Sequence, residues 1–207
     1  MTITRLADKA GAALTPTEAD QNMGTLDLRT GPGWRDNIAQ IDTRGGGTAP
    51  GLNLYRDGIY LYEFSAESMM EVFANYHIDH DYKLGSMLYP HLHFTTTNAA
   101  AGVVRLGFEY TIAKGHQQAK FPASSTLYLN VTVPANSDHL HFVAELGTGN
   151  GIAGTGIEPD TVVLMRVFRD AANPADTFAG TIFGICADLH YECDRYATPN
   201  RAPDFYA

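Results

Sequence analysis

The chain has 207 residues and a formal net charge of −9 at pH 7, from 14 basic and 23 acidic side chains. Hydrophobic residues make up 44% of the sequence and aromatic residues 11%, which supplies enough apolar surface for a core and excludes a disordered chain. The negative charge opposes binding to nucleic acid or to an anionic membrane. No stretch approaches the roughly 18 uninterrupted apolar residues of a membrane span, and the N-terminus lacks the apolar segment of a signal peptide. We therefore expect a protein made in the cytoplasm, with neither nucleic-acid binding nor membrane insertion.

Residues 1–50 are predicted to form an N-terminal arm with one short helix. Thr15 suits the N-cap position, the proline that follows suits the first helical position, and Glu18 completes a capping box. These signals predict a helix over residues 15–23. Residues 31–51 are rich in Gly, Pro, Thr and Asp and are predicted to be a glycine-rich linker. The boundary between the arm and the second domain is placed at residue 50.

Residues 51–207 repeat one pattern, in which a run rich in Tyr, Phe, Val, Ile and Thr is followed by a turn of Gly, Pro, Asn or Asp. This pattern is typical of β-strands. Eight strands are predicted, at residues 59–64, 72–78, 87–96, 103–112, 127–133, 139–146, 162–169 and 182–192. Eight strands in about 150 residues favour a jelly roll over an immunoglobulin sandwich. The predicted fold is therefore all-β, a jelly-roll-like two-sheet β-sandwich, with the glycine-rich residues 147–156 as an exposed loop.

Histidines and carboxylates recur at a spacing of two residues, which places them on one face of a strand. Three such groups occur: His91 with His93, His139 with His141, and Asp188 with His190 and Glu192. Imidazole is the commonest transition-metal ligand in proteins, so the candidate metal ligands are His91, His93 and His190. The simpler interpretation is that these histidines form the polar face of half-buried strands and are satisfied by hydrogen bonds.

The spacing of Gly85, His91 and His93 resembles the first half of the cupin motif, and cupins are jelly rolls. The glutamate that follows in cupins is absent here, and the second cupin motif is not recognisable. This partial resemblance leaves one alternative function, a cupin-like metalloenzyme that uses His91 and His93 with a further ligand from His139, His141 or His190.

A short motif near the N-terminus points to a different class of protein. It comprises Leu14, Thr15, Glu18, Asp20, Asn22 and Leu26. This stretch resembles the helical motif that opens many tailed-phage fibre proteins, with Met23 in place of the aromatic residue of the motif. The resemblance implies that these residues attach the chain to another protein of the particle.

The rest of the chain is similar to a group of phage-encoded virion proteins. The recurring features are residues 33–36, 80–85, 89–93, 107–116, 158–160 and 188–191. The similarity extends over nearly the whole length. It implies a component of the phage particle and supplies no catalytic residues.

The expected function is therefore that of a non-enzymatic virion structural protein without a cofactor, located in the virion of a tailed bacteriophage. Jelly-roll domains commonly assemble so that one subunit covers the sheet edge of the next, and we expect a homo-oligomer, with a trimer as the leading state. The expected partners are further copies of the chain and capsid, portal, collar or tail proteins, in a head decoration or a short head or tail fibre anchored by the arm. A second alternative is a fibre module that binds host carbohydrate, because tyrosine rings stack on sugars and carboxylates accept hydrogen bonds from hydroxyl groups.

Overall fold

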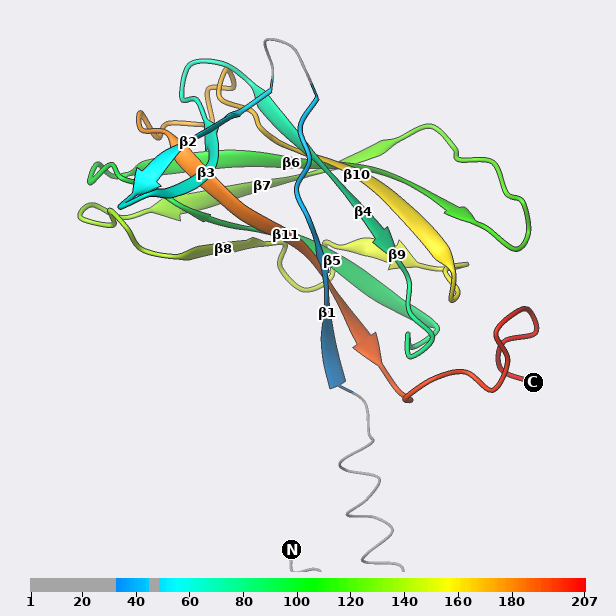
Figure 1. Cartoon of the computed structure of the whole chain (residues 1–207). Coiled ribbons are helices and arrows are strands. Elements are labelled where there is room, and N and C mark those ends of the chain that lie inside the picture. Colours follow the sequence, from blue (N-terminus) through cyan, green and yellow to red (C-terminus); the bar gives the residue numbers. More distant parts are fainter. Residues whose placement is uncertain (1–32, 45–48) are drawn as a thin grey trace, which may run out of the picture.

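Two antiparallel β-sheets stack face to face in this protein (Figure 1). The computed structural model describes residues 33–44 and 49–207. The strands are β1 (Gly33–Ala39), β2 (Gly51–Arg56), β3 (Ile59–Phe64), β4 (Met70–His77), β5 (Gly85–Thr95), β6 (Gly102–Lys114), β7 (Ser125–Val133), β8 (Phe142–Glu145), β9 (Ile152–Gly154), β10 (Thr161–Arg169) and β11 (Ile182–Cys193). Within the described ranges, no helix is long and apolar enough to cross a lipid bilayer.

The strand order is that of a jelly roll with additions at its margins. The four-stranded sheet has the order β4-β10-β6-β7, and the seven-stranded sheet contains the run β3-β11-β5-β8. Counted along the chain from β3 and without β9, these eight strands pair in the orders 2-7-4-5 and 1-8-3-6, as in two interlocked Greek keys. They are the eight strands that the sequence pattern predicts. The prediction of an all-β, jelly-roll-like two-sheet sandwich is confirmed.

Strand β1 extends the seven-stranded sheet at one end of the molecule (Figure 1). It pairs antiparallel with β11 along its whole length, and Ala39 and the nearby Ile41 are buried in the core. Residues 33–44 therefore belong to the sandwich, and the predicted domain boundary at residue 50 is wrong for this part of the arm. The predicted helix at residues 15–23 and the predicted attachment residues Leu14, Thr15, Glu18, Asp20, Asn22 and Leu26 lie outside the described residues.

Strand β9 lies within the glycine-rich segment that was expected to be an exposed loop. It pairs with β5, and its Ile152 is buried in the core. Gly154 permits the close approach, because a Cβ at this position would overlap the carbonyl oxygen of Ser86. The exposed-loop prediction is therefore wrong for residues 152–154.

Alternation along β5 and β11 separates the core from the outer face of the seven-stranded sheet. On β5, Leu88, Leu92 and Phe94 are buried in the core between the sheets. On β11, Ala187 and Leu189 are buried in the same core. The residues between them point to the opposite face, and several of these are histidines and acidic residues.

A buried ion pair fixes the turn that follows β10. Arg169 and Asp176 are both almost completely buried. Arg169 donates hydrogen bonds to the two carboxylate oxygens of Asp176, at 3.0 and 2.8 Å, and to the carbonyl oxygens of Phe178 and Gly180. Asp176 also accepts a hydrogen bond from the backbone N–H of Arg105 at 2.9 Å. Because every charge is compensated, this pair can hold the turn against β6.

Replacing Asp176 by Asn should lower the free energy of unfolding by about 3–5 kcal/mol, because the buried Arg169 guanidinium loses its counter-charge. Denaturant unfolding followed by far-UV circular dichroism measures the change. The partly exposed pair Arg195–Asp194 is the control, since Asp194→Asn should cost no more than about 1 kcal/mol. An Asp176→Asn protein as stable as the parent would show that the turn does not depend on this pair.

Candidate functional site

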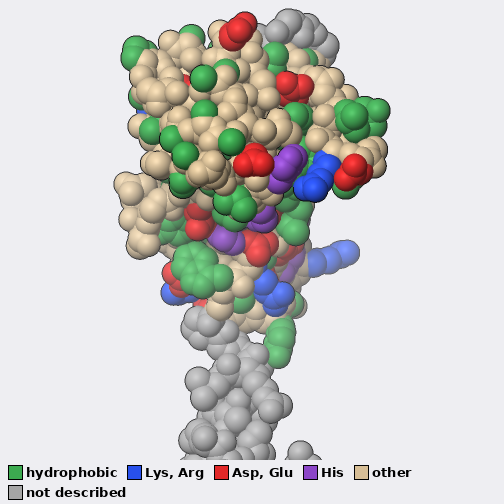
Figure 2. Space-filling view, turned by 90° about the vertical axis from the view of Figure 1, so that its left-hand side faces the viewer, with side chains coloured by type: hydrophobic (Ala, Val, Ile, Leu, Met, Phe, Trp, Pro, Cys, Tyr) green, Lys and Arg blue, Asp and Glu red, His purple; other side chains and the backbone are tan. Residues whose placement is uncertain are grey.

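Histidine and acidic side chains gather on the outer face of the seven-stranded sheet. We call this group the histidine–carboxylate cluster. It comprises Asp36 on β1, His91 and His93 on β5, His141 just before β8, Glu145 on β8, and Asp188 and His190 on β11. Figure 2 shows histidine side chains close to acidic ones on one side of the molecule.

Strand register brings these residues together from four separate parts of the chain. Asp36 is paired with His190 across the β1–β11 ladder. Asp188 is paired with His91 across the β11–β5 ladder, and His91 is paired in turn with Glu145 on β8. Directly paired residues share one face of a sheet, so the pairing itself builds the cluster.

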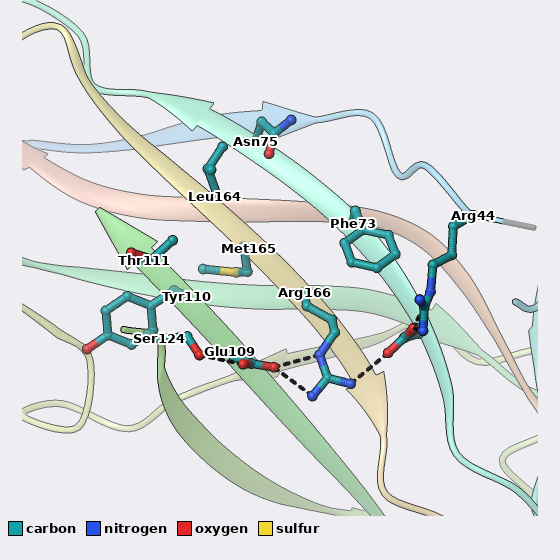
Figure 3. A pocket seen from close by; sticks show the side chains of 11 residues that line it. Arg44, Phe73, Asn75, Glu109, Tyr110, Thr111, Ser124, Leu164, Met165 and Arg166 are labelled. Atoms are coloured by element: carbon teal, nitrogen blue, oxygen red, sulfur yellow. Dashed lines mark hydrogen bonds and ion pairs between the residues drawn. The ribbon is translucent and has the colours of Figure 1, made fainter. Parts of the chain in front are cut away.

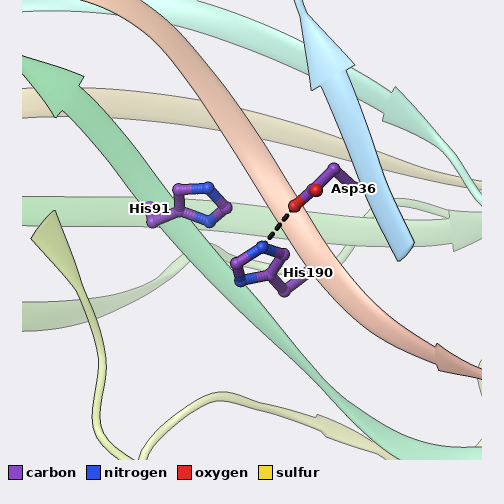
Figure 4. Close-up of side chains that lie close together, drawn as sticks. All are labelled: Asp36, His91 and His190. Atoms are coloured by element: carbon purple, nitrogen blue, oxygen red, sulfur yellow. Dashed lines mark ion pairs between the residues drawn. The ribbon is translucent and has the colours of Figure 1, made fainter. Parts of the chain in front are cut away.

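His190 lies between two carboxylates. Its Nε2 contacts the Asp36 carboxylate (Figure 4), and its Nδ1 contacts the Glu145 carboxylate. Strand β5 lies between β11 and β8, so the contact between His190 on β11 and Glu145 on β8 passes over β5. This contact covers His91 on β5, whose ring centre is 4.1 Å from that of His190.

His91 is the most enclosed member of the cluster, with 1% of its surface exposed. Its Nδ1 is 3.4 Å from the backbone oxygen of Tyr89, which can accept a hydrogen bond from the ring. Burial, together with the nearby charge of His190, lowers the pKa of His91 below its usual value. The neutral form of the ring is therefore favoured at pH 7.

Asp188 faces the imidazoles of β5 from the neighbouring strand. Its Oδ2 is 3.5 Å from His91 Nε2 and 3.1 Å from His93 Nε2. Its Oδ1 is buried and has no hydrogen-bond partner. His93 Nδ1 is 2.7 Å from Nε2 of His141, so a chain of imidazoles leads from Asp188 toward the surface.

The predicted candidate ligands His91, His93 and His190 are brought together, as the metal hypothesis requires. Their ring centres lie 5.0 Å apart for His91 and His93 and 4.1 Å apart for His91 and His190. The expectation that His139 and His141 point together is wrong. His139 precedes β8 in a left-handed backbone conformation, with φ of 62°, and its Nδ1 is 3.0 Å from the hydroxyl oxygen of Tyr55 instead.

Sequence reasoning missed two acidic members of the cluster. Asp36 lies in the segment that was expected to be a linker. No local alternation of apolar and polar residues predicts the strand β1 on which it lies. Glu145 could have been found, because it lies at even spacing from His141 within the predicted strand.

An open pocket of about 280 Å³ lies beside the cluster. It is lined by Trp34, Tyr89, Glu145, Leu146, Thr148 and His190. The Trp34 and Tyr89 rings meet edge to face, with ring centres 5.8 Å apart, and 61% of the Trp34 surface is exposed. The pocket thus combines an exposed aromatic ring with a carboxylate and an imidazole.

A larger, shallower hollow of about 690 Å³ lies on the four-stranded sheet (Figure 3). Arg166 donates hydrogen bonds to Glu109 and to Glu71, both at 2.6 Å, and Arg44 donates to Glu71 at 2.7 Å. The hydrogen bonds from Ser124 and then Arg166 lower the pKa of Glu109 below its usual value. The charged side chains of this hollow thus form ion pairs with one another, and these pairs link β4, β10 and β6.

Three further histidines surround a single carboxylate at the opposite end of β4. The Nε2 atoms of His77, His80 and His116 lie 3.1, 3.4 and 2.7 Å from oxygens of Asp160. Burial raises the pKa of Asp160, but the hydrogen bond from His116 and the two other rings outweigh burial and lower it. The side chain of His77 is more than half exposed, so this group is an open surface cluster.

Comparisons with known proteins do not identify a family. No protein-family model matches the chain, and no curated protein matches it. Among solved structures, TmCBM61, a protein bound to β-1,4-galactotriose, aligns with 78% of this chain and 88% of its own at 10% sequence identity and a TM-score of 0.29. A similarity this weak carries no argument about ligand or activity.

Proposed function

We propose that the chain is a non-enzymatic structural protein of a tailed-phage virion, a homo-oligomer that docks through its N-terminal arm and presents the jelly roll as a head decoration or a short fibre. The N-terminal motif and the whole-length resemblance to virion proteins motivate the proposal. The observation that supports it best is an uncovered apolar surface on the hairpin β2–β3.

The hairpin β2–β3 has a side that faces the same way as the core. The four-stranded sheet leaves much of this side exposed. Phe64 on β3 is fully buried in the core, and Tyr60 lies on the same side of that strand. Leu52 and Leu54 on β2 are paired with Tyr62 and Tyr60, so all four share the core-facing side. Yet Leu52, Leu54 and Tyr60 are each more than half exposed.

A second copy of the chain is the occupant that fits this apolar surface. Strand β2 lies at the edge of the seven-stranded sheet, and exposed apolar edges favour association unless a neighbour covers them. In a closed ring, one surface of each subunit covers the β2–β3 edge of the next subunit. Every copy of this edge is then covered. The arm joins the sandwich at Gly33, the first residue of β1, and attachment at this end leaves β2–β3 accessible to neighbouring copies.

Deleting residues 1–30 should leave the sandwich folded, because the described strands begin at Gly33, and should remove the protein from phage particles. Immunoblotting of gradient-purified particles, from infections complemented with the full or the shortened chain, measures incorporation. Circular dichroism of the shortened chain is the control for folding. Incorporation of the shortened chain at the parent level would refute docking through the arm.

Replacing Leu54 by Asp should dissociate the oligomer into 22.5 kDa chains, because it places a charge in the proposed interface. The melting temperature of the chain itself should change little, since exposed substitutions typically alter stability by no more than about 0.5 kcal/mol. Multi-angle light scattering at micromolar concentration measures the mass.

The control for this experiment is Leu84→Asp, which alters a similarly exposed leucine outside the hairpin and should leave the oligomer intact. Two results would contradict the proposed interface. One is a parent protein that is monomeric at micromolar concentration, and the other is a Leu54→Asp protein with the parent's mass.

A second candidate function, binding of a host glycan, is favoured by the pocket beside the cluster. Its exposed Trp34 offers an aromatic face on which a sugar ring can stack. Glu145 and His190 line the same pocket and can form hydrogen bonds with hydroxyl groups. This arrangement is compatible with a virion protein that also contacts the cell surface.

If the pocket binds a glycan, Trp34→Ala should weaken binding by about 10-fold, which corresponds to the loss of one stacking contact. A glycan array identifies the ligand, and titration calorimetry measures the affinity of parent and variant. Tyr196→Ala, at an exposed aromatic residue away from the pocket, should bind as the parent does. The absence of any glycan signal at high protein concentration would remove this candidate.

A further inference from the structure

We propose that His91, His93 and Asp188 bind a divalent transition-metal ion, and that this ion cross-links β5 and β11 on the outer face of the sheet. Zn²⁺ is the ion used to test the site. The inference goes beyond the proposed virion function and does not depend on it. It assigns three of the cluster residues to one site.

The spacing of the three ligand atoms matches what such an ion requires. One ring nitrogen of His91, one of His93 and a carboxylate oxygen of Asp188 all lie within 4.8 Å of one another. Metal bonds of about 2.0–2.2 Å in a tetrahedral site separate the ligand atoms by roughly 3.3 Å. The distances from Asp188 Oδ2 to the two Nε2 atoms, 3.5 and 3.1 Å, lie on either side of that value.

The position of His91 suits a metal ligand. Its Nδ1 lies 3.4 Å from the carbonyl oxygen of Tyr89, and its Nε2 lies 3.5 Å from Asp188 Oδ2. Donation of Nδ1–H to a backbone oxygen is the usual way in which proteins orient a metal-binding imidazole and leave Nε2 for the ion.

Asp188 supplies an independent reason to expect a ligand at this place. Its side chain is only 6% exposed, and its buried Oδ1 has no hydrogen-bond partner. No lysine or arginine of the described ranges forms an ion pair with it. A buried carboxylate oxygen without a partner is costly, and a metal ion bound to the carboxylate would offset that cost.

The donor set selects the class of ion. Two imidazoles and one carboxylate suit zinc, iron and related transition metals, whereas calcium and magnesium prefer oxygen ligands. His190 stays outside the set, because both of its nitrogens already contact the carboxylates of Asp36 and Glu145.

The surroundings point to a structural rather than a catalytic ion. The pocket beside the cluster is lined by none of the three ligands, and the contact between His190 and Glu145 covers His91. A catalytic metal needs a position open to substrate. An enclosed ion between paired strands instead cross-links them.

The test uses full-length protein purified with its affinity tag removed, stripped with a chelator and dialysed. Titration with Zn²⁺, followed by calorimetry and by elemental analysis, should show one ion per chain. Zinc at about 100 times its dissociation constant should raise the melting temperature by about 5–10 °C, and Mg²⁺ at the same concentration should not. A parent protein that neither binds zinc stoichiometrically nor gains stability from it would overturn the proposal.

Variants locate the site within the cluster. His93→Gln and Asp188→Asn should each weaken zinc binding by at least about 10-fold, whereas His190→Gln and the distant His116→Gln should bind as the parent does. His93 is partly exposed, so His93→Gln decides the question even if the Asp188 variant fails to fold. Parent-like binding by His93→Gln, or a loss of binding in His190→Gln as large as that in His93→Gln, would refute the assignment.

Discussion

The antiparallel pairing of β5 with β11 is the constraint on which the rest of the structure depends. These two strands form the centre of the seven-stranded sheet, and their register sets which residues face inward. Leu92 pairs with Ala187 in the core, and His91 pairs with Asp188 on the outer face. A shift of one residue in either strand would bury charges and expose the core, so core and cluster are specified by the same ladder.

The same alternation explains what the sequence could predict and what it could not. The eight jelly-roll strands lie in segments rich in β-branched and aromatic residues that turn residues separate, and all eight were predicted. Strand β1 was missed because its outward residues include Trp34 and Ile38, both largely exposed, so apolar residues do not mark its buried side. Strand β9 was missed because close backbone packing at Gly154 requires glycine, and glycine also marks flexible loops.

The histidines of the candidate site follow directly from the pattern, but their partners do not. Two-residue spacing shows that His91 and His93 share a face, without saying which strand lies beside them. The roles of Asp36 and Glu145 depend on pairing between distant parts of the chain. Local sequence therefore identified the imidazoles and Asp188, and the sheet topology added Asp36 and Glu145.

The central claim is that this jelly roll is built to be part of a particle, with apolar edges for its own copies and an arm for attachment. Electron microscopy of intact phage particles carrying a labelled copy of the chain tests this most directly. The account predicts label at regular, symmetry-related positions on the head, collar or tail. Label that is absent from purified particles but present in the infected-cell lysate would contradict it.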